Sequence, residues 1–212
     1  MKTFHLSLLL VFVLVICSGC SQIDEKKSTE NVLFRDDFTE PGNDWGLINS
    51  EEGVIEYAQG GLRFFVRKQN TDLWTITGRN FPNVDIHVQA TRRNAIVNNL
   101  FGVICRYQNS HHFYMLVVSS DGYFGALKKN GESYSLIGQE QLKYSDELKN
   151  TGDTVQLRAV CKGNQLSMFV NDRKLLDVQD DEFTDGAVGL MVGALSEPGV
   201  DILFDFFEVR DP

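Results

Sequence analysis

Residues 155–170, VQLRAVCKGNQLSMFV, alternate between apolar and polar side chains on both sides of a central Gly163-Asn164 pair. Such alternation is typical of a strand with one face in a core and the other in water. Glycine adopts positive φ without steric cost, so Gly-Asn between two such runs predicts a two-residue hairpin turn. With this turn three apolar pairs share one face, as a correct register requires: Cys161 with Leu166, Ala159 with Met168, and Leu157 with Val170.

The same period of two recurs along most of the chain from Val32 onward. Dipeptides that favour tight turns separate the runs, as at Asp121-Gly122 and Asn130-Gly131. Only Tyr144–Lys149 invites a helical turn. The pattern predicts strands near Val32–Phe38, Val54–Tyr57, Leu62–Lys68, Leu73–Thr77, Val84–Arg92, Leu100–Tyr107, Phe113–Ser119, Tyr123–Lys129, Tyr134–Ile137, Thr154–Lys162, Gln165–Val170, Lys174–Val178, Ala187–Val192 and Asp201–Val209.

Many short strands, with no helical period of any length, predict an all-β fold. We expect a two-sheet antiparallel sandwich of the jelly-roll type, and a closed lipocalin-like barrel is the alternative. The chain has 212 residues, which suits one domain with a well-buried core, over residues 32–212.

The N-terminus has the layout of a secretory signal. Lys2 supplies a positive charge, Leu6–Ile16 is an apolar run too short to span a bilayer, and small residues follow it. The sequence Cys17-Ser18-Gly19-Cys20 resembles the bacterial lipobox, although leucine is commonest where Cys17 stands. The resemblance implies that residues 1–19 are a signal peptide and that Cys20 is acylated, with chains such as palmitate. An ordinary signal peptide, with Cys20 as a stray thiol, is the alternative.

Residues 20–31 would then form the lipidated cysteine and a polar tether, which as a flexible coil would span about 18–20 Å. Two or three acyl chains hold a protein stably to a lipid bilayer. We therefore expect a protein of the cell envelope, anchored to the membrane on its extracytoplasmic side. The formal net charge is −9 and Lys and Arg do not cluster, which argues against a nucleic-acid partner.

An ordered set of short segments carries a family resemblance. The segments are Leu33–Phe38, Phe101–Gln108, His112–Tyr114, Ser119–Tyr123, Asn130-Gly131, Cys161–Asn164, Phe169–Asn171, Asp185-Gly186, Val188–Leu190, and Phe204-Asp205 with Phe207. Together they resemble bacterial concanavalin A-like sandwich domains, which include the laminin-G-like group and the domain linked to 3-keto-disaccharide hydrolases. Lectins, hydrolases and structural modules share this fold, so the resemblance implies the fold and leaves the function open.

Two cysteines remain after Cys20, and both are expected to point into the core. Cys105 shares its predicted strand face with Phe101, Val103 and Tyr107, and Cys161 lies on the apolar face of its own strand. An exported protein experiences an oxidising compartment, so we predict a disulfide between Cys105 and Cys161. Two buried free thiols are the alternative.

Four residues on the predicted outer faces form the candidate ligand site. A symmetric loop centred on Ser110 would place Arg106 opposite Tyr114, and Cys105 opposite Met115. A guanidinium beside a tyrosine ring combines a fork of donors with an apolar surface, which suits a sugar or a carboxylate. His87 and Arg158 also face outward and would border this platform. A cross-strand pair without a ligand is the alternative.

The sequence suggests no cofactor and no metal site. Asp36-Asp37 could meet Asp201 and Asp205 if the first and last strands pair, but no calcium-loop motif is present. The chain also has neither the paired-carboxylate run of sandwich glycosidases nor the Gly-x-Ser-x-Gly of a nucleophile elbow.

The sequence therefore favours a binding module for carbohydrate, or for another cell-envelope ligand, over an enzyme. The alternatives are a structural envelope lipoprotein without a small ligand and a hydrolase of the 3-keto-disaccharide type.

Overall fold

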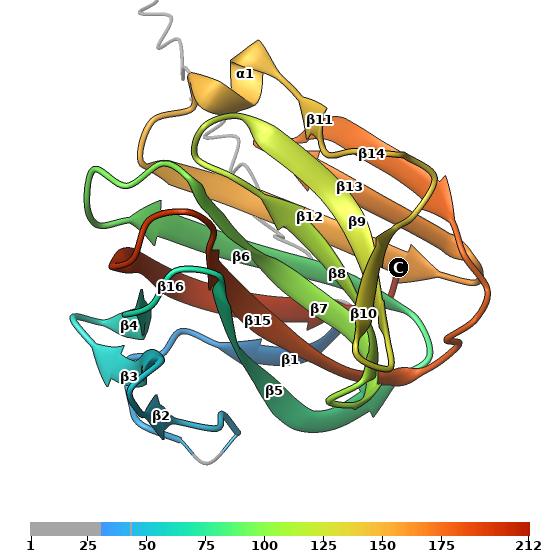
Figure 1. The fold of residues 1–212 in the computed structure, drawn as a ribbon. Helices are drawn as coiled ribbons and strands as arrows, with labels where there is room; N and C mark the ends of the chain where they lie inside the picture. The colour runs from blue at the N-terminus through green and yellow to red at the C-terminus, as the bar shows by residue number, and fades with distance from the viewer. Residues whose placement is uncertain (1–30, 43) are drawn as a thin grey trace, which may run out of the picture.

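The computed structural model describes residues 31–42 and 44–212 (Figure 1). The predicted signal peptide, Cys20 and most of the predicted tether lie outside these residues. Within the described part of the chain, no helix is long and apolar enough to cross a membrane.

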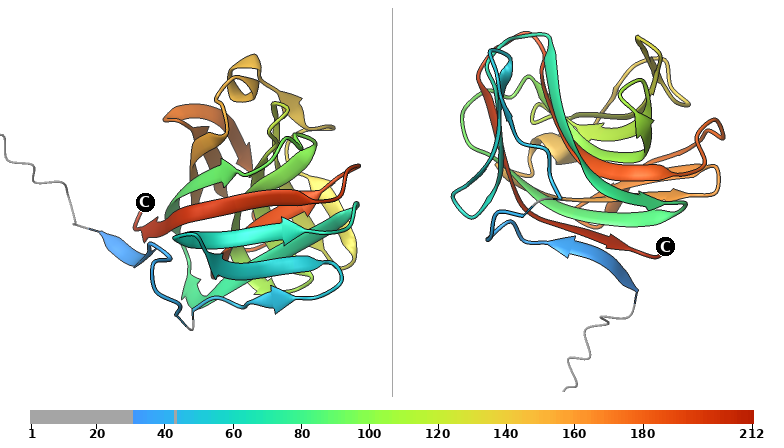
Figure 2. Two further views of the ribbon diagram at one scale, coloured as in Figure 1. Left: turned by 90° about the vertical axis from the view of Figure 1, so that its left-hand side faces the viewer. Right: turned by 90° about the horizontal axis from the view of Figure 1, so that it is seen from below.

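The described residues form two antiparallel sheets, which face each other as the layers of a sandwich (Figures 1 and 2). We call them the larger and the smaller sheet. The larger sheet has the order β14 (Arg173–Gln179), β13 (Gln165–Val170), β12 (Thr154–Lys162), β6 (Val84–Arg92), β16 (Val200–Arg210), β4 (Gly61–Val66), β3 (Gly53–Ala58) and β2 (Ile48–Asn49), and β1 (Val32–Asp36) pairs with β16. The smaller sheet has the order β10 (Ser133–Leu136), β9 (Tyr123–Asn130), β8 (His112–Val118), β7 (Asn99–Asn109), β15 (Gly186–Ala194) and β5 (Thr71–Phe81), and β11 (Lys143–Tyr144) pairs with β9.

The predicted all-β sandwich is confirmed, and two open sheets replace the alternative of a closed barrel. Each predicted strand overlaps a strand of the structure, whereas the two-residue strands β2 and β11 were not predicted. The helical turn near Tyr144–Lys149 is α1 (Asp146–Lys149). Its cap is Ser145, whose hydroxyl accepts a hydrogen bond from the Leu148 amide at 3.2 Å.

The hairpin of residues 155–170 has the predicted register. Cys161 pairs with Leu166, Ala159 with Met168 and Leu157 with Val170, and these side chains are buried between the sheets. The structure also confirms the disulfide between Cys105 of β7 and Cys161 of β12, with Cα atoms 6.8 Å apart. Because β7 belongs to the smaller sheet and β12 to the larger, this bond joins the two layers across the core.

The predicted register of the β7–β8 hairpin is wrong. Asn109 pairs with His112 around a two-residue turn, and a bulge in β7 then makes Cys105 pair with Tyr114. Arg106 lies in the bulge with φ of 54°, a left-handed conformation that side-chain alternation does not reveal. Arg106 therefore does not lie opposite Tyr114, nor Cys105 opposite Met115.

The bulge also reverses the faces expected along β8 and at Tyr107, whereas Phe101, Val103 and Cys105 face the core as predicted. Tyr114 is in the main core with Leu116 and Val118, whereas Phe113, Met115 and Val117 lie in a second apolar cluster on the opposite face of the smaller sheet. Tyr107 packs against that second cluster and not the core. Strand β8 is thus buried on both faces.

The face that carries the second cluster is concave. Trp74 of β5 packs on Phe113 of β8 with ring centroids 5.8 Å apart, although β15 and β7 lie between the two strands. The sheet must therefore curl strongly, as the right-hand view in Figure 2 shows.

The sandwich has two distinct ends. At the tether end, the Asp211 amide donates to the Asn31 carbonyl at 3.0 Å and Val32 pairs with Arg210. Arg210 also pairs with Asp85, which pairs with Val160, so the Gly163-Asn164 turn lies at this end too. The loop from β6 to β7 and the loop after β15 lie at the opposite end (Figure 1). There the Ser196 amide donates to Asn98 Oδ1 at 3.0 Å. We call this second end the pocket end.

Candidate functional site

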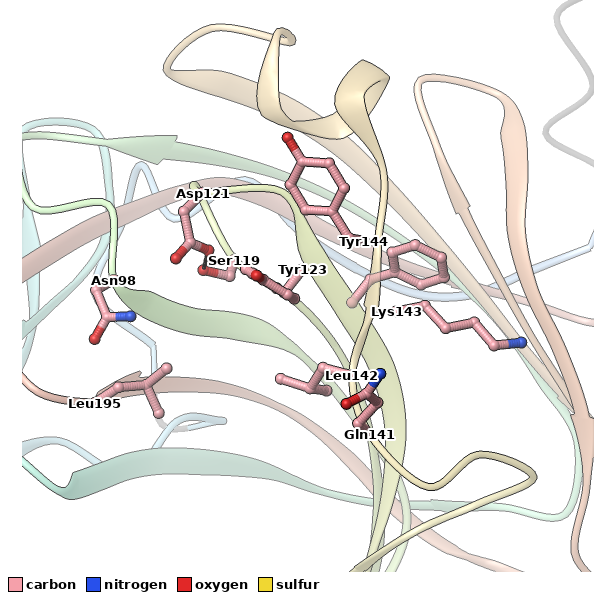
Figure 3. A pocket seen from close by; sticks show the side chains of 10 residues that line it. Asn98, Ser119, Asp121, Tyr123, Gln141, Leu142, Lys143, Tyr144 and Leu195 are labelled. Atoms are coloured by element: carbon pink, nitrogen blue, oxygen red, sulfur yellow. Dashed lines mark hydrogen bonds between the residues drawn. The ribbon is translucent and has the colours of Figure 1, made fainter.

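An open pocket of about 1010 Å³ lies at the pocket end, beside the concave face of the smaller sheet (Figure 3). Four segments that are distant in the sequence supply its lining. The residues are Asn98, Ser119, Asp121, Tyr123, Phe124, Gln141, Leu142, Lys143, Tyr144 and Leu195.

The turn between β8 and β9 forms one wall. The Ser119 amide donates to the Tyr123 carbonyl at 2.7 Å, and Gly122 closes the turn with φ of 101°. The Ser119 hydroxyl contacts the Asp121 carboxylate and also donates to the Val97 carbonyl at 3.2 Å. These bonds fix the turn against the loop before β7, so this wall is preorganised.

Two tyrosines form the most distinctive part of the lining. Tyr123 of β9 pairs with Tyr144 of β11, and their rings meet edge to face with centroids 5.4 Å apart. The two residues are 42% and 44% exposed. The Tyr144 hydroxyl donates to Asp146 at 2.9 Å, and this bond raises the pKa of Tyr144.

The remaining lining combines amides, charges and an apolar base. Asn98 Oδ1 accepts from Ser196, and Figure 3 shows the Asn98 amide nitrogen on the pocket side. Gln141 and Lys143 lie at the outer margin (Figure 3). Leu142 and Leu195 pack against the second apolar cluster, so the base of the pocket is continuous with it.

This combination of groups suits a sugar. A pyranose ring has an apolar face of C–H groups and a rim of hydroxyls, which match aromatic faces and amide or carboxylate groups respectively. Pockets for small ligands usually measure about 300–1,000 Å³, so this one has room for more than a single sugar unit.

The predicted platform of Arg106 and Tyr114 does not exist on the surface. Their side chains are 1% and 0% exposed, so neither ring nor guanidinium can stack on a ligand. Arg106 instead donates from Nη1 to the Phe183 carbonyl at 2.7 Å and from Nη2 to the Gly163 carbonyl. Burial lowers the pKa of Arg106.

Tyr114 binds the segment that follows β14 and contains Phe183, the residue whose carbonyl accepts from Arg106. Its hydroxyl donates to Asp180 and accepts from the Phe183 amide at 2.9 Å, while Lys128 lies 2.7 Å from both Asp180 and Glu182. Burial and the bond to Asp180 raise the pKa of Tyr114. Burial would raise the pKa of Asp180, but hydrogen bonds from Lys128 and Tyr114 outweigh it and keep that pKa below its usual value.

His87 and Arg158 lie together on the outer face of the larger sheet, far from the pocket lining. They are register partners, and both contact Asp85. Arg158 donates from Nε at 2.8 Å and from Nη2 at 2.7 Å, and His87 Nε2 lies 3.0 Å from Asp85 Oδ1. Burial would raise the pKa of Asp85, but His87 and Arg158 outweigh it and lower the pKa to about 2.

We expect Asp85→Asn to make the domain less stable at pH 6 but not near pH 2. The pKa of Asp85 is about 2 in the folded state, against an ordinary 3.8, so the ionised carboxylate stabilises the folded domain fully above pH 4. This stabilisation is lost as the pH falls from 3.8 to about 2. The difference between the proteins should be about 2 kcal/mol at pH 6. Urea unfolding of both proteins at several pH values measures it. A difference that does not change with pH would contradict this role for Asp85.

The carboxylates considered for calcium have other partners. Asp36 accepts from the Trp45 ring nitrogen at 2.8 Å, Asp201 binds Arg63 at 2.8 Å, and Asp205 accepts from Gln89 at 2.7 Å. Among residues 31–42 and 44–212, no group of three or more His, Cys, Asp or Glu side chains could hold a metal ion.

Sequence reasoning missed the pocket because its parts come from separate loops. The Asp121-Gly122 turn was recognised, and the strand from Tyr123 was predicted. The pairing that brings Tyr144 onto Tyr123 depends on β11, a two-residue strand without any period. The local signal is limited to Tyr123, which directly follows the Asp121-Gly122 turn.

Comparisons with solved structures place the fold. The carbohydrate-binding module CBM66 from Bacillus subtilis matches with a TM-score of 0.60 and 14% identity, over 76% of this chain and 92% of the module. A Bacillus subtilis protein of unknown function with a galectin-like fold matches with a TM-score of 0.61 and 12% identity, over 85% of this chain and 96% of that protein. A GH16 protein of the Bacteroides ovatus mixed-linkage glucan locus was solved with a G4G4G3G product. It matches with a TM-score of 0.60 and 9% identity, over 84% of this chain and 99% of that protein.

These similarities confirm the predicted jelly-roll sandwich of the concanavalin A-like type. At such low identity they establish the fold alone. No family model and no curated protein sequence matches the chain.

Proposed function

We propose that this chain is a lipoprotein of the cell envelope, anchored by acylated Cys20 on the extracytoplasmic side, whose domain binds carbohydrate in the pocket of Figure 3. The lipobox-like Cys17-Ser18-Gly19-Cys20 after an apolar run supports the anchor. The disulfide between the sheets is consistent with export, because such bonds persist in oxidising compartments.

The observation that carries the binding proposal is the exposed pair of Tyr123 and Tyr144 over a large, partly polar pocket. Exposed aromatic rings are costly to leave in water, and they are enriched where proteins bind ligands. The structural neighbours include a carbohydrate-binding module and a glycoside hydrolase, and this shared fold supports a carbohydrate ligand.

Replacing Tyr123 or Tyr144 by alanine should weaken carbohydrate binding by about 30-fold each, the effect typical of an aromatic anchor at a binding site. A glycan array that includes mixed-linkage glucan oligosaccharides identifies the probe. Titration calorimetry with the best array glycan then compares the variants with the unaltered protein. Both tyrosines are exposed, so melting temperatures should change little.

Tyr134→Ala is the matched control. Tyr134 is 40% exposed on the same sheet, but it lies outside the pocket lining, with Lys129 Nζ 4.3 Å from its ring. Its replacement should leave affinity unchanged. Equal affinity in all three variants would exclude the pocket as the site. An array on which no glycan binds would favour a structural envelope lipoprotein, and cleavage of the bound glycan would indicate a hydrolase.

A further inference from the structure

We infer that the anchored domain holds its pocket away from the bilayer, so that its ligand is a polymer beyond the membrane surface and not a glycan on a lipid headgroup. This inference rests on the anchor and the carbohydrate site proposed above. It comes from where the chain enters the sandwich and where the pocket opens.

The described chain begins at the tether end. Val32 pairs with Arg210, the last residue of β16, and Asn31 binds the amide of Asp211. Arg210 pairs in turn with Asp85, which pairs with Val160 close to the Gly163-Asn164 turn. The membrane-linked segment therefore joins the larger sheet at one extreme of its strands.

The pocket opens at the other extreme. Strand β16 begins there at Val200, and the Arg93 amide donates to the carbonyl of Asp201 at 2.8 Å. Asn98 and Leu195 of the pocket lining belong to the two loops at this end, which Asn98 joins by its bonds to Ser196. The pocket thus lies about one length of β16 from the point where the chain enters. Eleven strand residues span about 36 Å.

The reach of the tether decides which end can meet lipid. Residues 21–31 can span at most about 40 Å when fully extended. To press the pocket onto the headgroups, the domain would have to invert, with Asn31 about one strand length above the bilayer. The tether would then be near its full length, where few conformations remain, so this orientation is disfavoured by entropy.

The surface at the tether end is compatible with a lipid interface. Val32 and Leu33 are 37% and 46% exposed there, and the Arg35 side chain is 61% exposed beside them. Aliphatic side chains next to a long cationic one suit the boundary between headgroups and acyl chains. The exposed Tyr123 and Tyr144 of the pocket lie at the opposite end.

Site-specific labelling of the mature acylated protein in vesicles tests the orientation. One variant, Lys162→Cys, places a fluorophore at the tether end, and its matched control, Lys143→Cys, places the same fluorophore on the pocket margin; both lysines are exposed. In phosphatidylcholine vesicles with a headgroup quencher, we expect several-fold stronger quenching at position 162. Equal quenching at both positions, or stronger quenching at 143, would overturn the inference.

A competition experiment tests the class of ligand. Vesicle-bound protein should bind the best array glycan, as a free oligosaccharide, with the affinity of the protein in detergent. The same oligosaccharide conjugated to lipid in the same vesicles should not compete for the pocket. Competition by the lipid conjugate as strong as that by the free glycan would overturn the inference.

A wrong anchor or a wrong carbohydrate site can be distinguished from a wrong orientation of the domain. If the Cys20→Ala variant stays in the membrane fraction, the acyl anchor is wrong, whatever the labels show. If the label at position 162 is quenched selectively but no glycan binds, the carbohydrate site is wrong while the orientation stands.

Discussion

Replacing Cys105 and Cys161 together by alanine should lower the free energy of unfolding by about 4 kcal/mol. The bond closes a loop with a sequence separation of 56 residues, and a cross-link over such a loop removes many conformations from the unfolded chain. Both cysteines are fully buried, so the substitutions also leave small voids between the sheets. Urea unfolding followed by tryptophan fluorescence measures the loss.

Reduction provides the internal control. The unaltered protein should lose stability in dithiothreitol and approach the double variant, whereas the double variant should not respond to the reductant. If the unaltered protein unfolds at the same urea concentration with and without dithiothreitol, the bond does not form in the protein.

Replacing Arg106 by alanine should cost about 3–5 kcal/mol, the second large effect. The guanidinium donates to two carbonyls, of Phe183 and Gly163, and a hydrogen bond from a charged group contributes about 1.5–3 kcal/mol. Without it the Phe183 carbonyl loses its buried donor, and a cavity replaces a long side chain. Arg106→Lys keeps one donor group and should cost less.

Arg93→Ala is the control for this variant. Arg93 is exposed, and replacing an exposed arginine usually changes stability by less than about 0.5 kcal/mol. Equilibrium unfolding of the three variants gives the ranking. An Arg106→Ala protein as stable as Arg93→Ala would show that the buried guanidinium does not hold the segment after β14 to the Gly163-Asn164 turn.

Side-chain alternation predicts the burial of the two cysteines correctly but places Arg106 on the wrong face. The disulfide followed from alternation, because Cys161 and Cys105 lie on apolar faces of strands that the pattern located correctly. For Arg106 the same alternation, next to core-facing Cys105 in a symmetric hairpin, predicts the outer face. The left-handed φ of Arg106 in the bulge turns its side chain inward, where two carbonyls accept its hydrogen bonds.

Features that depend on neighbouring residues can be predicted from the sequence. Alternation locates the strands, and Gly163-Asn164 sets the register of its hairpin, because the turn and its flanking pairs lie within a few residues. The segment Phe113–Val118 is apolar at every position, so its period could not reveal which side chains face the core.

Long-range strand pairing settles which side chains of this segment face the core, and it also forms the pocket. Tyr123, Asn98, Leu195 and Tyr144 come together because four loops meet at one end of curved sheets. No local period encodes such a meeting, since it depends on the order and curvature of strands that are far apart in the chain.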